Sequence, residues 1–233
     1  MTDPGALPLY LQVSELLMRD IAAGRLADGQ RLPPERDMAA ELGIAVGTLR
    51  AALADLTGKG LLVRVQGSGN YVRAQTDPAS VYALFRLELL AGGGLPTARV
   101  LSVDRLPKPA NLPGFGPSPH AHRIRRLRSL SGTPAAVEEI WLDASHAGDI
   151  ALLDLSESLY LFYREHLGLW IARAEDRIGQ GPLPGWAPAG FPRTPGTTLP
   201  EVTRLAFDQR GHPCETSQTW YDPDTVRYTV RLT

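Results

Sequence analysis

Two arginines and a serine in the second half of the chain have the types and spacing of an anion-binding site. Arg126 and Arg128 are two residues apart in RIRRLRS, a stretch that predicts a β-strand, so their side chains should share one face of a sheet. Two like charges there repel each other unless an anion or carboxylates lie between them. Ser158 precedes a predicted helix, whose first N–H groups can bind an anion. These residues predict a site for a phosphate or carboxylate.

A second interpretation of the two arginines needs no ligand. Glu138 and Glu139 lie on the next predicted strand, across a Gly-Thr-Pro turn, and either carboxylate could pair with Arg126 and Arg128. Strand register is not fixed by the sequence, so both interpretations stay open.

Metal chemistry and thiol chemistry have little support. The five histidines lie mostly in predicted loops without cysteine partners: His120, His122, His146, His166 and His212. Cys214 is the only cysteine and has no identifiable base beside it. We therefore expect no metal, no cofactor and no catalytic residues.

Basic residues in the first third of the chain are candidates for contact with nucleic acid: Arg36, Arg50, Lys59 and Arg64. The net charge of −1 argues mildly against a DNA-binding protein. Residues 1–73 hold eight basic and eight acidic side chains, so a basic face has to come from their placement.

The elements that would position these basic residues are two short helices within 32–53, joined by a turn at Gly43. A helix over 7–24 precedes them, with an apolar stripe of Tyr10, Val13, Leu17 and Ile21. After them, runs at 61–66 and 70–73 flank Gly67-Ser68-Gly69 and predict a β-hairpin, with which residues 30–32 could pair. Helix, turn, helix and hairpin is the layout of a winged helix-turn-helix, whose second helix enters the DNA major groove.

The second half of the chain predicts an antiparallel α+β domain. Expected strands cover 123–129, 135–142, 169–178, 202–208, 213–221 and 227–232, and a helix covers 158–167 with Ser158 as its N-cap. Residues 92–120 and 179–198 are rich in glycine and proline.

Length and composition agree with this division. The 233 residues, 43% apolar and 21% charged, suggest one or two globular domains. The polar stretch 74–80 predicts a linker between a domain at 1–73 and one at 81–233. No apolar run of membrane-spanning length and no leader is visible, and one cysteine suits a reducing compartment. We expect a cytoplasmic protein with no membrane contact.

Residues 7–73 resemble the DNA-binding domain of the GntR family of bacterial transcription regulators. The matching residues include Pro8-Leu9-Tyr10, Leu32-Pro33, Glu35-Arg36, Leu42-Gly43, Thr48-Leu49-Arg50, Gly60-Leu61 and Gln66-Gly67. The resemblance implies that Arg36, Thr48, Arg50 and the wing tip, Gly67, Ser68 and Gly69, contact DNA. With Arg64 and Gln66 beside them, these residues make up the predicted DNA-binding set.

The chain departs from the family pattern next to the predicted recognition helix and in the wing. Ala45-Val46 stands where the family usually has Ser-Arg. Val65 and Ser68 stand where a second arginine and often a basic residue occur. An alternative is that the winged helix serves contacts with protein.

Residues 81–233 resemble the UTRA effector-binding domain of the HutC subfamily, which is similar in fold to chorismate lyase. The matching residues include Arg126-Leu127-Arg128, Gly132-Thr133-Pro134, Ser158-Leu159-Tyr160, Leu167-Gly168-Leu169 and Arg204-Leu205-Ala206-Phe207-Asp208. The resemblance implies that Arg126, Arg128 and Ser158 bind the anionic group, and that four further residues contact the effector: Glu138, Tyr160, Glu215 and Tyr221. The usual helix between Glu175 and Arg204 is replaced by a Gly/Pro-rich stretch, which leaves one wall of the pocket undefined.

Together the resemblances imply a homodimeric repressor on a near-palindromic DNA operator, released by a small anionic metabolite. Amino-sugar phosphates, phosphonates, sugar acids and amino-acid catabolites all suit the subfamily. The alternatives are a lyase-like enzyme, an activator, or a regulator that has lost tight DNA binding. No acid–base or nucleophile constellation supports the enzyme.

Overall fold

The computed structural model describes residues 8–22, 24–73, 84–155 and 158–230, in two compact units. One unit covers Leu7–Arg86 together with the residues from Thr229, and the other covers Leu87–Tyr228. The expected linker at 74–80 lies outside the described residues. In the described part of the chain, no helix is long and apolar enough to cross a membrane.

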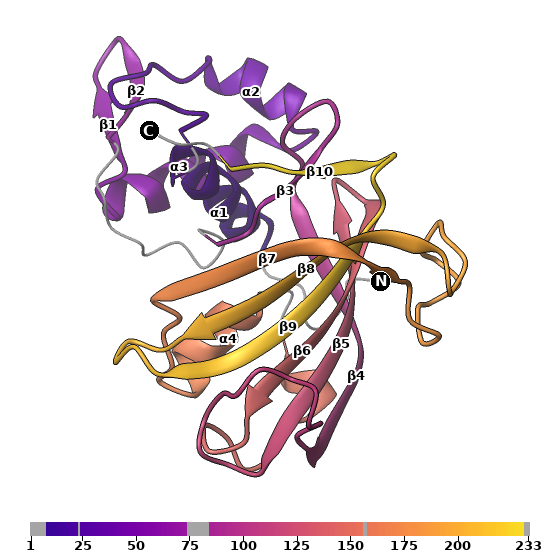
Figure 1. Ribbon diagram of the computed structural model, residues 1–233. Coiled ribbons are helices and arrows are strands. Elements are labelled where there is room, and N and C mark those ends of the chain that lie inside the picture. Colours follow the sequence, from indigo (N-terminus) through magenta and orange to yellow (C-terminus); the bar gives the residue numbers. More distant parts are fainter. Residues whose placement is uncertain (1–7, 23, 74–83, 156–157, 231–233) are drawn as a thin grey trace. The chain divides into compact units, whose positions relative to one another are not determined.

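The N-terminal unit is a winged helix-turn-helix (Figure 1). It contains α1 (Leu9–Ala22), α2 (Glu35–Glu41) and α3 (Val46–Gly58), then the wing, β1 (Leu62–Val65) and β2 (Gly69–Val72). Its core joins the apolar stripes of the three helices, with Val13, Leu49 and Leu56 fully buried. Gly43 turns between α2 and α3 at φ +65°, a conformation that glycine adopts without a steric cost. The predicted third strand is a single bridge, Arg31 to Tyr71.

The C-terminal unit is built on a six-stranded antiparallel sheet of order β4-β5-β6-β9-β8-β7 (Figure 1). The strands are β4 (Pro96–Pro107), β5 (His120–Leu130), β6 (Thr133–Asp143), β7 (Arg173–Pro182), β8 (Thr198–Phe207) and β9 (Pro213–Tyr221). A 3-10 turn, Leu152–Asp154, and α4 (Leu159–His166) connect β6 to β7. A small second sheet pairs β3 (Leu87–Leu89) with β10 (Val226–Tyr228).

Several strand bounds differ from the predicted ones. β4 occupies a stretch that the sequence marks only as rich in glycine and proline, because its prolines stand at the two ends of an otherwise β-prone run. β7 begins at Arg173, four residues after the predicted start, and runs into the Gly/Pro-rich stretch. Within the described part of the last predicted strand, β10 ends at Tyr228 and joins the small sheet, and residues 231 and 232 lie outside the described ranges. The α+β fold itself is confirmed.

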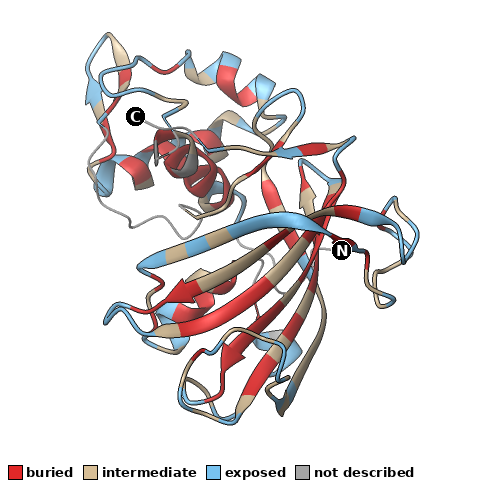
Figure 2. Cartoon of the chain, viewed as in Figure 1, coloured by how far each residue is buried: buried red, intermediate tan, exposed pale blue. Residues whose placement is uncertain are grey.

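The two faces of the six-stranded sheet are covered by different parts of the chain. Figure 2 shows that most residues of the central strands are buried. Side chains alternate along each strand, so Arg126, Glu138 and Glu215 share one face. We call it the α4 face, because two tyrosines of α4 bond to Glu215 there. On the opposite face, Leu183 and Phe191 of the Gly/Pro-rich stretch pack in one cluster with Leu127, Val137, Leu199 and Trp220. The described part of that stretch therefore covers the face away from the predicted effector residues.

Candidate functional site

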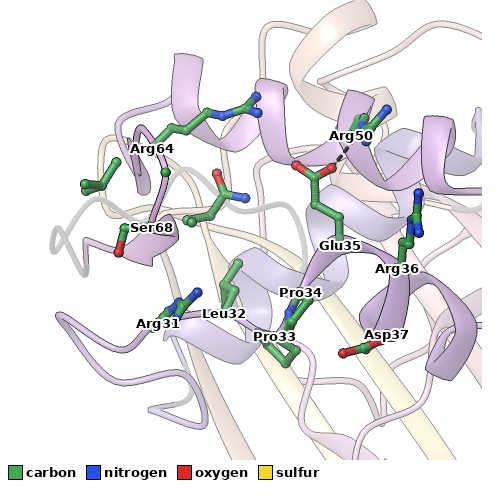
Figure 3. Close-up of a pocket in the computed structure, with 14 residues that line it drawn as sticks. Arg31, Leu32, Pro33, Pro34, Glu35, Arg36, Asp37, Arg50, Arg64 and Ser68 are labelled. Atoms are coloured by element: carbon green, nitrogen blue, oxygen red, sulfur yellow. Dashed lines mark hydrogen bonds and ion pairs between the residues drawn. The ribbon is translucent and has the colours of Figure 1, made fainter.

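A hollow of about 480 Å³ lies between the start of α2, the helix α3 and the wing (Figure 3). Six of the eight predicted DNA-binding residues line it: Arg36, Arg50, Arg64, Gly67, Ser68 and Gly69. Thr48, half-buried on α3, and Gln66, exposed at the wing, are not among the lining residues. The tertiary fold therefore brings several basic side chains together on one surface, although the net charge of the chain is −1.

Arg50 projects from the predicted recognition helix and is already oriented by a partner. Its Nε donates to Oε2 of Glu35 at 2.6 Å, while 64% of the arginine side chain stays exposed. Because the pair is at the surface, its own contribution to stability is small. Lys59 instead bonds to Asp55 one turn back on α3 and does not line the hollow.

The start of α3 shows the consequence of the Ala45-Val46 departure. Ala45 is the N-cap residue, and the helix begins without a side-chain hydrogen bond. A serine there would accept a hydrogen bond from one of the first N–H groups. The N-terminal unit therefore forms α3 without this cap.

The predicted effector residues gather on the α4 face of the sheet. Arg126 faces Glu138 in the β5–β6 register, and Arg128 shares a row with Tyr221 on either side of Ala136. Ser158 is buried at the start of α4, where its Oγ accepts from the Leu161 N–H at 3.3 Å. The predicted N-cap role of Ser158 is confirmed.

Glu138 carries the interaction that the ligand-free interpretation of the sequence expects. Its Oε2 accepts from Arg126 Nη2 at 2.7 Å and from Arg128 Nε at 3.0 Å. All three side chains are buried. Burial opposes ionisation of the Glu138 carboxyl, but the charges of the two arginines and their hydrogen bonds hold its pKa below the usual value. Glu139 points to the other face and pairs with Arg125 at 2.7 Å.

A second polar group lies on the same face, around Glu215. Tyr163 donates to its Oε2 at 2.7 Å and Tyr160 to its Oε1 at 3.2 Å. Burial raises the pKa of the Glu215 carboxyl although both hydroxyls and the charge of Arg126 favour the ionised form. Arg204, which forms two bonds of 2.6 and 2.7 Å with Asp176, also bonds to Tyr160.

Two members of this group, Tyr163 and Arg204, are absent from the predicted site. Tyr163 follows Tyr160 by three residues on one helix, a spacing that places both on the same side. Arg204 lies on β8, and only the strand order brings it to the site. The α4 face thus combines buried cations with hydroxyl and carboxyl groups, a set that can bind a polar anion.

Of the histidines and the cysteine, His122 and Cys214 are buried. His122 is buried, and its Nε2 bonds to the Ala147 carbonyl at 3.0 Å. Burial raises the pKa of the Cys214 thiol. Within the described ranges, no three His, Cys, Asp or Glu side chains are arranged to hold a metal ion.

Comparison with known proteins matches both units. Residues 9–72 fit the model of the bacterial regulatory proteins of the gntR family, and residues 91–227 fit the UTRA domain. The transcriptional regulator SmoD of Agrobacterium fabrum is 60% identical over 98% of this chain and 97% of its own. The mannosyl-D-glycerate transport/metabolism system repressor MngR of Escherichia coli is 29% identical over 75% of each chain.

A solved structure supports the fold as well. The YydK protein of Bacillus subtilis superposes with a TM-score of 0.53, at 20% identity, over 97% of this chain and all of its own. The family matches establish a transcription regulator and not an enzyme. The chain belongs to the GntR family, in the HutC subfamily that joins a winged helix-turn-helix to a UTRA domain.

Proposed function

We propose that this regulator is a repressor that leaves its operator when a small anionic metabolite binds the α4 face. The observation that carries the proposal is the pair of buried guanidinium groups, Arg126 and Arg128, held side by side through Glu138. The two buried guanidinium groups offer charged hydrogen-bond donors that suit an anion. The repressor role is supported by relatives such as MngR, which is itself a repressor.

The ligand would bind through a charged end and a polar end. Arg126, Arg128 and Ser158 form the charged end and would bind a phosphate, sulfonate or carboxylate. Tyr160, Glu215, Glu138 and Tyr221 form the polar end and would hydrogen-bond to hydroxyl or amide groups of the ligand. Ligand entry would take over part of the Glu138 contacts with the arginines.

On DNA, the protein would act as a homodimer that places α3 of each copy in successive major grooves of a near-palindromic operator. Arg36, Thr48, Arg50, Arg64 and the wing residues 66–69 would contact DNA. The effector would favour a conformation in which the N-terminal units of the two copies no longer fit the operator half-sites. This role places the protein in the cytoplasm, with its operator.

The test is an operator-release assay on the full-length protein. Fluorescence anisotropy with the chain's own upstream DNA should show a specific complex, and a panel of phosphorylated, sulfonated and carboxylated metabolites should include one that dissociates it. Arg128→Ala should keep the complex but need ten- to hundredfold more effector for release, because a charge-assisted contact is worth roughly 1.5–3 kcal/mol. Arg177→Ala, which removes an exposed arginine on the other face of the sheet, is the matched control and should release normally. Release of Arg128→Ala at wild-type effector concentrations would contradict the proposal.

A further inference from the structure

The wing of the DNA-binding unit has no positive charge at its tip. The stretch from Val65 to Asn70 reads VQGSGN, without a lysine or arginine. A wing that approaches the DNA backbone gains affinity chiefly from cations beside the phosphates. Arg64 on β1 precedes this stretch, and any further cation beside the tip has to come from another part of the fold.

Arg31 lies at the base of the wing. Its backbone forms a bridge with Tyr71 on β2, and the neighbouring residues extend the pairing through Leu32 N–H to Asn70 O and Val72 N–H to Gln30 O, both at 2.9 Å. These bonds fix the position of the Arg31 backbone next to the second wing strand.

The side chain of Arg31 is directed over Gly69 toward the wing tip. A Cβ on Gly69 would lie 3.3 Å from Arg31 Nε and 3.8 Å from Nη2, so a bare glycine backbone lets the guanidinium approach. Gly69 also has φ +129°, which L side chains rarely adopt. The glycine therefore serves both the turn and the placement of the arginine.

Arg31 is available for a ligand. It is exposed and lines the same hollow as Arg36, Arg50 and Arg64, and Figure 3 draws it among the lining residues. Arg50 is engaged with Glu35, whereas among the described residues Arg31 forms no ion pair. The three atoms nearest to a Cβ built on Gly69 all belong to the Arg31 side chain.

We infer that Arg31 is a DNA-phosphate contact that supplies a positive charge at the wing tip. The guanidinium binds a backbone phosphate where the wing meets the duplex, while α3 reads bases. Because a phosphate contact carries no sequence information, Arg31 contributes to affinity for any duplex and not to operator preference. The inference rests on DNA binding by this unit and adds a residue that the sequence did not select.

The experiment compares full-length wild type and Arg31→Ala on operator DNA and on a random duplex, between 50 and 300 mM salt. Removal of one phosphate contact should reduce the slope of log K against log salt by about 0.9, which at 0.1 M salt corresponds to about an eightfold weakening on both DNAs. Arg31→Lys should keep most of the slope. Arg73→Ala removes an exposed arginine that does not line the hollow, and should leave the slope unchanged.

A rescue variant separates an effect of charge from an effect of structure. Val65 lines the same hollow and is 45% exposed, so Arg31→Ala/Val65→Arg returns a cation to the wing without changing the core. Recovery of the salt slope would support the phosphate contact. Three results would overturn it. The first is a wild-type salt slope for Arg31→Ala, and the second is a loss of affinity confined to operator DNA at an unchanged slope. The third is a double variant whose slope does not recover. Binding of both DNAs by the wild type shows in the same titration that the DNA-binding function itself holds.

Discussion

Arg126 on β5 and Glu138 on β6 face each other directly in the sheet, with Arg126 Nη2 2.7 Å from Glu138 Oε2. Arg128 bonds to the same oxygen, so one carboxylate serves two buried cations. The ion pairs that the ligand-free interpretation predicted therefore exist. They do not exclude an effector, because an entering anion could take the place of the shared carboxylate.

Removing the shared carboxylate should increase the affinity of this site for an anion. Glu138→Gln removes the charged carboxylate that two buried guanidinium groups share, which should destabilise the protein by about 3–5 kcal/mol. Inorganic phosphate should raise the melting temperature of this variant more than that of wild type. Glu139→Gln, on the opposite face, is the control. An equal response of all three proteins to phosphate would argue against an anion site.

Arg128→Ala separates binding from folding. We expect a ten- to hundredfold loss of effector affinity, because a charge-assisted contact to a desolvated anion is worth roughly 1.5–3 kcal/mol. Operator affinity without effector should stay near wild type, so the variant would stay on the operator at effector concentrations that release wild type. If only the melting temperature falls and calorimetry finds wild-type effector affinity, the arginine has a structural role alone.

Arg50→Ala tests the recognition helix. Removal of a base contact should weaken operator binding by about 1–3 kcal/mol, and removal of a phosphate contact should lower the salt slope by about 0.9. Glu35→Gln removes the present partner of Arg50 and a negative charge from the hollow, so it should not weaken binding to random DNA. Gel shifts on operator and random duplexes distinguish these results, and unchanged binding by Arg50→Ala would contradict the assignment.

Glu215 should make stability depend on pH in the direction opposite to an ordinary ion-paired carboxylate. Its folded pKa is raised, so the folded state holds a proton that the unfolded state has lost above its own pKa of about 4.3. The stabilising contribution is complete below that value and is lost as pH rises through the folded pKa. Scanning calorimetry should therefore show the melting temperature of Glu215→Gln improving relative to wild type from pH 4 to pH 7. A difference that is constant with pH would contradict the assignment.

The C-terminal unit should hold the dimer. One winged helix covers too short a site for strong specificity, and two-fold operators are read by two-fold proteins. Light scattering on residues 75–233 should give twice the monomer mass at micromolar concentration. A monomer for this fragment beside a full-length dimer would shift the interface to the N-terminal unit.

The sequence by itself determined the local structure and the family. Apolar spacing and glycine turns define the three helices and the wing, and β9 has the bounds that its alternation predicts. The two-residue period of a strand also suffices to place Arg126 and Arg128 on one face. These features are readable because each depends on neighbours within a few residues along the chain.

Only the tertiary structure decided which partners meet. Register assigned Glu138 to both arginines and Glu139 to Arg125, because a shift of one residue exchanges the two faces. Strand order brought Arg204 to Tyr160, and the bridge to Tyr71 brought Arg31 to the wing. These contacts join residues far apart in the sequence, and their geometry depends on the packing of the whole unit and not on local pattern.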